Sequence, residues 1–209
     1  YIVGWACWLL MWLLASQLHA QSTDVAFVRY TTDQGLSNDG ITAIARDQRG
    51  FIWIGTLNGL NRFDGIEFKI YKRTGKPAGL PGNYIVNGGI KPDRNGFLWI
   101  STNRGLYRFD PVREQGQTIS LPLLNDQQAD NDFISPVHFD REGKGWFSSI
   151  EHLYRIDPIT LELTTFSLPF PVAGTYDEPF ADRNGQLWLH VQDALYQFDA
   201  NTQHYTYLL

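Results

Sequence analysis

The sequence repeats one pattern four times, and this repeat limits the possible folds more than any other feature. Asp, Gly, Trp, Leu and Asp recur at fixed columns in four ungapped 18-residue segments: 47–64, 93–110, 140–157 and 182–199. The repeated tryptophans are Trp53, Trp99, Trp146 and Trp188. Their spacings of 46, 47 and 42 residues match the length of a four-stranded propeller blade. The sequence therefore predicts an all-β propeller with four recognisable four-stranded blades.

Each repeated column has a structural reason. The Asp-x-x-Gly that opens each segment predicts a hairpin turn, in which the Asp side chain accepts from backbone amides and Gly closes the loop. The Trp lies between aliphatic residues on a strand that is apolar on both faces, which is typical of sheets stacked blade on blade. We therefore assign a structural role, rather than catalysis, calcium binding or sugar stacking, to the Trp column and to Asp47, Asp93, Asp140 and Asp182.

The strands around the repeat follow from residue type. Fourth strands are expected at Phe68–Tyr71, Gln117–Leu121, Leu161–Leu168 and His204–Leu208. First strands are expected near Ile41–Ala45, Tyr84–Asn87, Phe133–Phe139 and Tyr176–Ala181. Pro136 and Pro179 fit the last two of these poorly, because proline cannot donate to a strand ladder.

An unpaired segment at the start bears on the size of the ring. Phe27–Tyr30 resembles Phe68–Tyr71 and predicts a fourth-type strand, which in a closed propeller completes the last blade. Seven blades would need roughly 315 residues. We therefore expect residues 27–209 to be the N-terminal part of a larger, about seven-bladed propeller. A self-contained ring of four blades is the alternative.

The apolar stretch Ile2–Ala15 predicts export. It is 14 residues long, which suits a signal peptide over residues 1–20 better than a membrane span of about 20 residues. An uncleaved signal anchor is the alternative. Cys7, the only cysteine, lies inside this stretch, so a mature chain would have no disulfide, zinc-binding thiolate or thiol nucleophile.

Charge and motifs exclude several functions. The chain has 17 Lys and Arg against 22 Asp and Glu, a net charge of −5, and it has no polybasic run. This balance argues against nucleic-acid binding by this portion. No phosphate-binding loop, nucleophile elbow or paired histidines at metal spacing occur in it. We therefore expect no catalytic residue, cofactor or metal site here.

Ligand contacts are expected where the repeats differ, on loops that share one rim of the propeller. The hairpin between the second and third strands of each blade provides one aligned polar column, with a histidine near its last member: Asn58, Arg104, Glu151, Asp193 and His190. Such groups suit a polyhydroxylated ligand. The alternative is that these turns are polar only because they face water.

The residues from Phe27 to Tyr71, FVRYTTDQGLSNDGITAIARDQRGFIWIGTLNGLNRFDGIEFKIY, resemble the opening repeat of two-component regulator propellers. These form the periplasmic sensor region of bacterial hybrid histidine kinases. The resemblance implies consecutive propellers, a β-sandwich, a membrane span and a cytoplasmic kinase or diguanylate cyclase. It also implies an inner-membrane homodimer that senses glycan fragments or another small extracellular ligand, with its membrane anchor and phosphorelay outside these residues.

The sequence thus favours a non-enzymatic, exported sensor propeller of a two-component receptor, regulating transcription or second-messenger output through domains outside this chain. The alternatives are a secreted propeller enzyme, such as a glycan lyase, and a protein-interaction scaffold.

Overall fold

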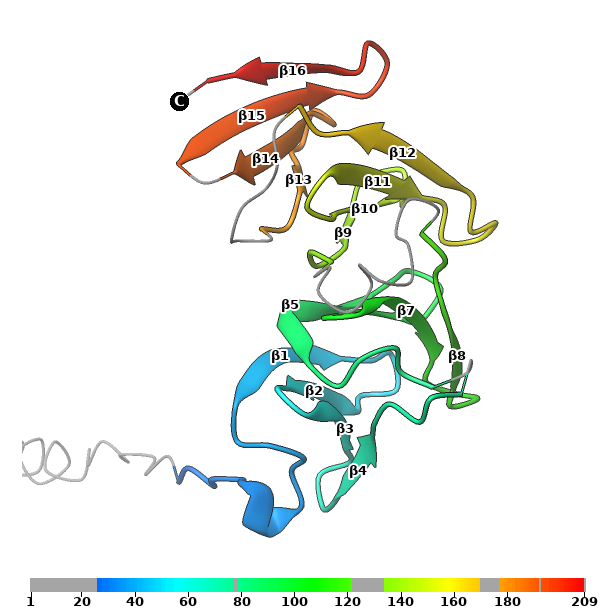
Figure 1. Ribbon diagram of the computed structural model, residues 1–209. Helices are drawn as coiled ribbons and strands as arrows, with labels where there is room; N and C mark the ends of the chain where they lie inside the picture. Colours follow the sequence, from blue (N-terminus) through cyan, green and yellow to red (C-terminus); the bar gives the residue numbers. More distant parts are fainter. Residues whose placement is uncertain (1–25, 77–78, 122–133, 170–176, 192, 209) are drawn as a thin grey trace, which may run out of the picture.

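The structure, a computed structural model, describes residues 26–76, 79–121, 134–169, 177–191 and 193–208. The leader predicted over residues 1–20 lies outside these ranges. Within them the regular structure is β, apart from one turn of 3-10 helix at Thr32–Gln34. Four antiparallel four-stranded sheets follow one another along the chain, and Figure 1 shows them stacked with the first and the last at opposite ends.

We call the sheets blades 1 to 4. Blade 1 consists of β1 (Ile41–Arg46), β2 (Ile52–Thr56), β3 (Gly59–Phe63) and β4 (Phe68–Tyr71). Blade 2 consists of β5 (Ile85–Pro92), β6 (Leu98–Thr102), β7 (Gly105–Asp110) and β8 (Gln115–Thr118). Blade 3 consists of β9 (His138–Phe139), β10 (Gly145–Ser148), β11 (His152–Ile156) and β12 (Leu163–Ser167). Blade 4 consists of β13 (Phe180–Ala181), β14 (Leu187–Val191), β15 (Ala194–Asp199) and β16 (His204–Tyr207).

The all-β propeller architecture predicted from the repeat is confirmed. In each blade the strands are hydrogen-bonded in sequence order, which is the arrangement of a propeller blade. Contacts between neighbouring sheets involve the first strands, since β1 contacts β5 and β9 contacts β13. The first strands therefore lie on the inner side of the stack.

The first strands depart from their predicted bounds. The strands predicted to end at Phe139 and Ala181 form only the short β9 and β13, which begin after Pro136 and Pro179. Prolines lack the amide hydrogen that a ladder requires. In contrast, β5 extends beyond Asn87 to Pro92, with a register shift between Ile85 and Ile90.

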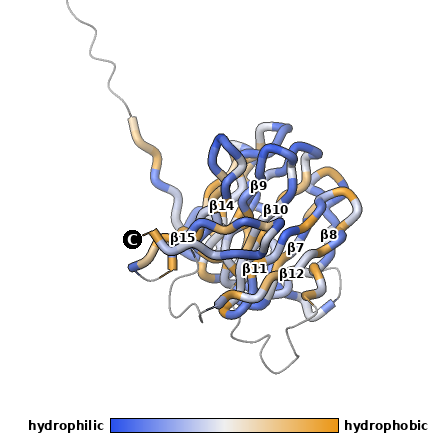
Figure 2. Tube along the Cα trace, turned by 90° about the horizontal axis from the view of Figure 1, so that it is seen from above, coloured by the Kyte–Doolittle hydropathy of each residue, from blue (hydrophilic) through white to orange (hydrophobic). Residues whose placement is uncertain are grey.

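The segment from Phe27 to Tyr30 is not a strand, so the prediction of a fourth-type strand there is wrong for this chain. Phe27 is 93% exposed, and the segment extends away from the sheets, with a hydrophobic start (Figure 2). Only its end touches blade 1, where the Tyr30 ring lies 4.9 Å from that of Phe63 and 5.7 Å from that of Phe68. A single extended segment forms no ladder without a neighbouring strand.

Three hydrophobic clusters fill the spaces between neighbouring blades. In the first, Trp53 and Leu60 of blade 1 pack with Leu98, Ile100 and other residues of blade 2. The second and third clusters join blades 2 and 3 around Trp99, and blades 3 and 4 around Trp146. Each of these tryptophans therefore faces the following blade. The core is divided among the blade interfaces, as in repeat proteins whose units stabilise their neighbours.

Each repeated Asp also holds its own Trp, a contact that the sequence analysis did not foresee. In blade 2, Asp93 Oδ1 accepts from the backbone amides of Asn95 and Phe97 at 2.8 and 3.0 Å, and Oδ2 accepts from Trp99 Nε1 at 2.9 Å. The Trp-to-Asp bond recurs in blades 1, 3 and 4 at 3.0, 2.8 and 3.2 Å. The Asp thus fixes the turn and the indole together.

The outer face of blade 1 is an uncovered interblade face within the described residues. Ile52 and Ile54 are half-buried, whereas Leu98 and Ile100, their equivalents in blade 2, are fully buried. Ile44, which is paired with Ile54 across the sheet, is 67% exposed. The same apolar columns therefore face solvent in blade 1 and a neighbouring sheet in blade 2.

The outer face of blade 4 is open in the same way. Trp188 and Leu195 are half-buried there, although Trp53 and Leu60 in the same columns of blade 1 have 0% exposure. Phe180, paired with Trp188 across the sheet, is 54% exposed. The four described blades therefore end in an apolar sheet face on both sides.

Candidate functional site

The predicted ligand column lies on hairpins at one edge of the blades. Asn58 and Arg104 occupy the β2–β3 and β6–β7 hairpins, and each backbone amide donates to a threonine hydroxyl at 3.1 Å, Thr56 for Asn58 and Thr102 for Arg104. These bonds set the shape of the turns. Both side chains are half-buried.

Glu151, Asp193 and His190 extend this column into blades 3 and 4. All three are exposed, and His190 Nδ1 pairs with the carboxylate of Asp177 just before β13. In the described parts of the chain, no hydrogen bond joins the side chains of Asn58, Glu151 and Asp193 to one another. The structure thus leaves them on separate turns of one edge, and ligand binding by this column stays a prediction.

A second candidate site lies on the inner side, where three blades meet. Glu178 lies just before β13, and its Oε2 accepts a hydrogen bond from Lys91 Nζ of β5 at 2.6 Å. Its Oε1 lies 3.4 Å from Nδ1 of His138 in β9. The ring of Phe180 lies 5.1 Å from that of His138. We call Lys91, His138 and Glu178 the axial cluster, because it joins the inner strands of blades 2, 3 and 4.

The axial cluster was not predicted, although the sequence contains a signal for it. The column two residues before the repeated Asp contains Ala45, Lys91, His138 and Phe180. A small side chain is thus replaced by ionisable ones in blades 2 and 3, which is the kind of departure from the repeat that marks a specialised position. Glu178 is 87 residues from Lys91 in the chain, so only the fold brings them together.

Electrostatics favour the charged form of Glu178. Burial works to raise the pKa of Glu178, but hydrogen bonds with His138 and Lys91, and the charges of both, outweigh burial and lower the pKa below its ordinary value. A carboxylate whose pKa is lower in the folded than in the unfolded state stabilises the fold above the ordinary pKa. That contribution is lost as the pH falls through the folded-state pKa.

Replacing Glu178 by Gln is therefore expected to lower the thermal unfolding midpoint by a few degrees at neutral pH. The gap to the wild type should begin to close as the pH falls below the ordinary pKa of a glutamate, and it should vanish only below the lowered folded-state pKa of Glu178, where the side chain is protonated in both states. Thermal denaturation followed by circular dichroism across this range measures the gap. Glu162→Gln, which changes an exposed carboxylate of the β11–β12 turn, is the control. A difference in unfolding midpoint between the wild type and Glu178→Gln that does not change with pH would contradict the lowered pKa of Glu178.

The opposite edge of the blades, where the Asp-x-x-Gly turns lie, contains one groove at each blade interface. The grooves between blades 1 and 2, 2 and 3, and 3 and 4 have volumes of about 310, 200 and 450 Å³. In the first of these, the Arg49 guanidinium donates to the carbonyl of Pro111 and lies 5.0 Å from the Phe51 ring. The last groove is the largest of the three.

The described residues contain no group of three or more His, Cys, Asp or Glu side chains that could hold a metal ion. No helix among them has the length and apolar character needed to cross a membrane.

Comparison with known proteins identifies the repeat. The family model described as "Two component regulator propeller" matches residues 35–58 and 79–104, which cover the turns and second strands of blades 1 and 2. Histidine kinase P4 of Formosa agariphila is 44% identical over 59 residues, a stretch that covers 28% of this chain and 4% of that protein. The chain thus spans a small part of this relative.

Solved structures show the same fold at lower identity. An extracellular domain from Bacteroides thetaiotaomicron, assigned to a one-component or hybrid two-component system, superposes with a TM-score of 0.68 at 20% identity, covering 90% of this chain and 24% of that one. A second such domain from a hybrid two-component system gives 0.57 at 21% identity, covering 86% and 31%.

Virginiamycin B lyase of Staphylococcus aureus, an inactive variant with quinupristin, also superposes on this chain. Its TM-score is 0.63 at 20% identity, covering 82% of this chain and 57% of the lyase. At this identity the likeness shows the fold alone. Residues 35–58 and 79–104 of this chain thus match two-component regulator propeller repeats, and the chain has a β-propeller fold.

Proposed function

We propose that this chain is the ligand-sensing propeller of a two-component signalling receptor, located outside the cytoplasm. In this role a ligand binds the propeller, and domains outside these residues produce the response. The observation that carries the proposal is the match of blades 1 and 2 to two-component regulator propeller repeats. The identity with a histidine kinase over 59 residues supports it.

The location and the ligand are parts of the same proposal. The apolar stretch Ile2–Ala15 supports export, by a cleaved signal peptide or by an anchor. Two solved neighbours are extracellular domains. The ligand we propose is a carbohydrate or another small extracellular molecule, and the complete receptor is an inner-membrane homodimer whose output is phosphorelay or cyclase activity.

We also propose that the four blades belong to a larger ring. The open faces of blades 1 and 4 support this, because they place Ile44, Ile54, Trp188 and Leu195 in columns that other blades bury. Exposed apolar faces of this kind mark interaction surfaces. A further blade on each face would cover them as the existing interfaces are covered.

The isolated chain is therefore expected to self-associate as its concentration rises, and Ile44→Lys should weaken that association by placing a charge on the open face. Sedimentation velocity measures both effects. Ile159→Lys changes an equally apolar and exposed residue in the β11–β12 turn and should leave association unchanged. A wild-type chain that stays monomeric and unfolds in one sharp transition would count against the larger ring.

The sensor role is tested in the native gene. An in-frame deletion of the codons for residues 27–209 should abolish induction of a defined gene set when cells are moved between carbohydrate sources, as measured by RNA sequencing. Unchanged transcription on every source, together with loss of a secreted enzymatic activity, would reject the sensor role in favour of a propeller enzyme.

A further inference from the structure

One arginine column behaves differently in the three blades that contain it. Arg62, Arg108 and Arg155 occupy the same position on the third strands, and each is paired across the sheet with the repeated Trp of its blade. All three therefore point towards the following blade.

The first two arginines each have a close partner within the protein. Arg62 Nη1 lies 2.7 Å from Glu114 Oε1, which comes from the β7–β8 turn of the following blade. The Arg108 guanidinium carbon lies 3.4 Å from the ring centroid of Phe97, a close stacking arrangement. A carboxylate thus pairs with Arg62, and an aromatic ring covers one face of the Arg108 guanidinium.

Arg155 lacks both arrangements. The turn position occupied by Glu114 in blade 2 is occupied by Gln203 in blade 4. Both residues have a left-handed backbone, with φ angles of 54° for Glu114 and 57° for Gln203. In blade 3 the position of Phe97 is occupied by Lys144. Its ammonium group pairs with the carboxylate of Asp157 and provides no ring for Arg155 to stack on. Among the described residues, Arg155 has no ion-pair partner, and its guanidinium carbon lies 5.7 Å from the Trp146 ring centroid.

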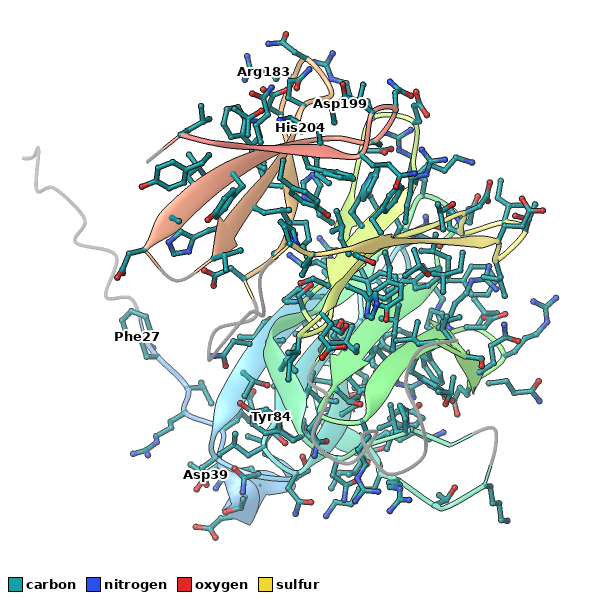
Figure 3. All side chains as sticks on the ribbon, turned by 45° about the horizontal axis from the view of Figure 1, so that its top comes forward. Phe27, Asp39, Tyr84, Arg183, Asp199 and His204 are labelled. Carbon is teal, nitrogen blue, oxygen red and sulfur yellow. The ribbon has the colours of Figure 1, made fainter. Side chains whose placement is uncertain are left out.

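Arg155 lines the largest of the three grooves. This groove, about 450 Å³, lies between blades 3 and 4, and amide side chains of Asn184, Gln186 and Asn201 also line it. Figure 3 shows Arg183, Asp199 and His204 gathered at this end of blade 4. The half-buried Arg155 therefore lies beside neutral donors and acceptors in an open groove, whose lining also includes the exposed Arg141.

The carboxylates of the groove limit the charge that a ligand can have. Asp140 accepts from Lys144 N and Trp146 Nε1, and Asp199 accepts from its own turn, so both are engaged in the fold. Glu142 is exposed at the rim and is able to accept from a hydroxyl. The lining thus has three carboxylates against the two arginines Arg141 and Arg155, a balance that disfavours a multiply charged anion such as phosphate.

We propose that the groove between blades 3 and 4 binds a hydroxylated monocarboxylate. Arg155 receives the carboxylate through two parallel N–H donors, the geometry that suits a guanidinium fork. Asn184, Gln186 and Glu142 bind the hydroxyl groups of the ligand. The inference deepens the proposed sensor function and rests on it for its biological meaning, but binding itself is measured without any signalling readout.

The test is isothermal titration of the full chain with sodium glucuronate, with glucose and acetate as partial probes. Glucuronate should bind in the millimolar range, and glucose and acetate should bind at least about tenfold more weakly, because each lacks one half of the recognised chemistry. Arg155→Gln should reduce glucuronate affinity about tenfold or more, and Arg155→Lys should recover only part of it.

Arg62→Gln is the matched control, because it removes the same side chain from the same column of blade 1 and should leave glucuronate binding unchanged. Circular dichroism checks that each variant is folded. Absence of glucuronate binding to the wild type, equal binding of glucose, or unchanged binding by a folded Arg155→Gln variant would each overturn the inference. None of these results bears on the transcriptional test of the sensor role.

Discussion

Replacing Trp53 by alanine is expected to lower the free energy of unfolding of the chain by about 3–5 kcal/mol. Trp53 has 0% exposure and lies between two blades, with its ring 5.5 Å from Tyr71 and 5.4 Å from Phe109. Its removal leaves a cavity at that interface and leaves Asp47 Oδ2 without the indole donor. Chemical denaturation followed by tryptophan fluorescence or circular dichroism measures the loss.

Trp188→Ala is the matched control for this prediction. Trp188 occupies the same column and bonds to Asp182 at 3.2 Å, but it is half-buried on the open face of blade 4. Its replacement should cost less than half as much. Equal losses in the free energy of unfolding for Trp53→Ala and Trp188→Ala would mean that packing between blades does not determine how much the repeated Trp stabilises the chain.

Replacing Asp93 by alanine is expected to lower the free energy of unfolding by about 2–3 kcal/mol, because each buried donor left without a partner costs about 1–3 kcal/mol. The carboxylate is 7% exposed and accepts from two backbone amides and from Trp99 Nε1. Both the turn and the position of the indole depend on it. Urea denaturation measures the change.

Asp199→Ala separates the turn from the indole contact. Asp199 accepts from the backbone amides of Asn201 and Thr202 in the exposed β15–β16 turn, at 2.8 and 3.4 Å, and it holds no tryptophan. The variant should lose about 1 kcal/mol or less. A loss as large as that of Asp93→Ala would show that turn bonds alone account for the effect.

The strand order and the blade repeat could be predicted because they depend on local patterns. The Asp-x-x-Gly turn and the alternation around Trp53 act within about ten residues, and β4 has the predicted bounds Phe68–Tyr71. The Trp-to-Asp bond could also have been inferred, since the six-residue offset between Asp and Trp is constant in all four repeats. A buried indole N–H normally has a hydrogen-bond acceptor, and the repeated Asp is an acceptor at a fixed distance along the chain.

Features that depend on distant contacts could not be predicted in the same way. The segment Phe27–Tyr30 has the composition of a strand, but a strand forms only with a partner, and the described residues provide none. The partner of Lys91 is Glu178, across two blades. Arg155 stands out only when its column is compared with the turn of the following blade, where Gln203 replaces a carboxylate.

The most direct test of the proposed sensor role is to determine whether the coding sequence continues beyond Leu209 and what it encodes. The account predicts further Asp-x-x-Gly-x-x-Trp repeats that supply blades for the open face of blade 4, followed by a membrane span and a histidine kinase or diguanylate cyclase module. A stop codon directly after Leu209, or a hydrolase or lyase module in place of the signalling domains, would contradict it.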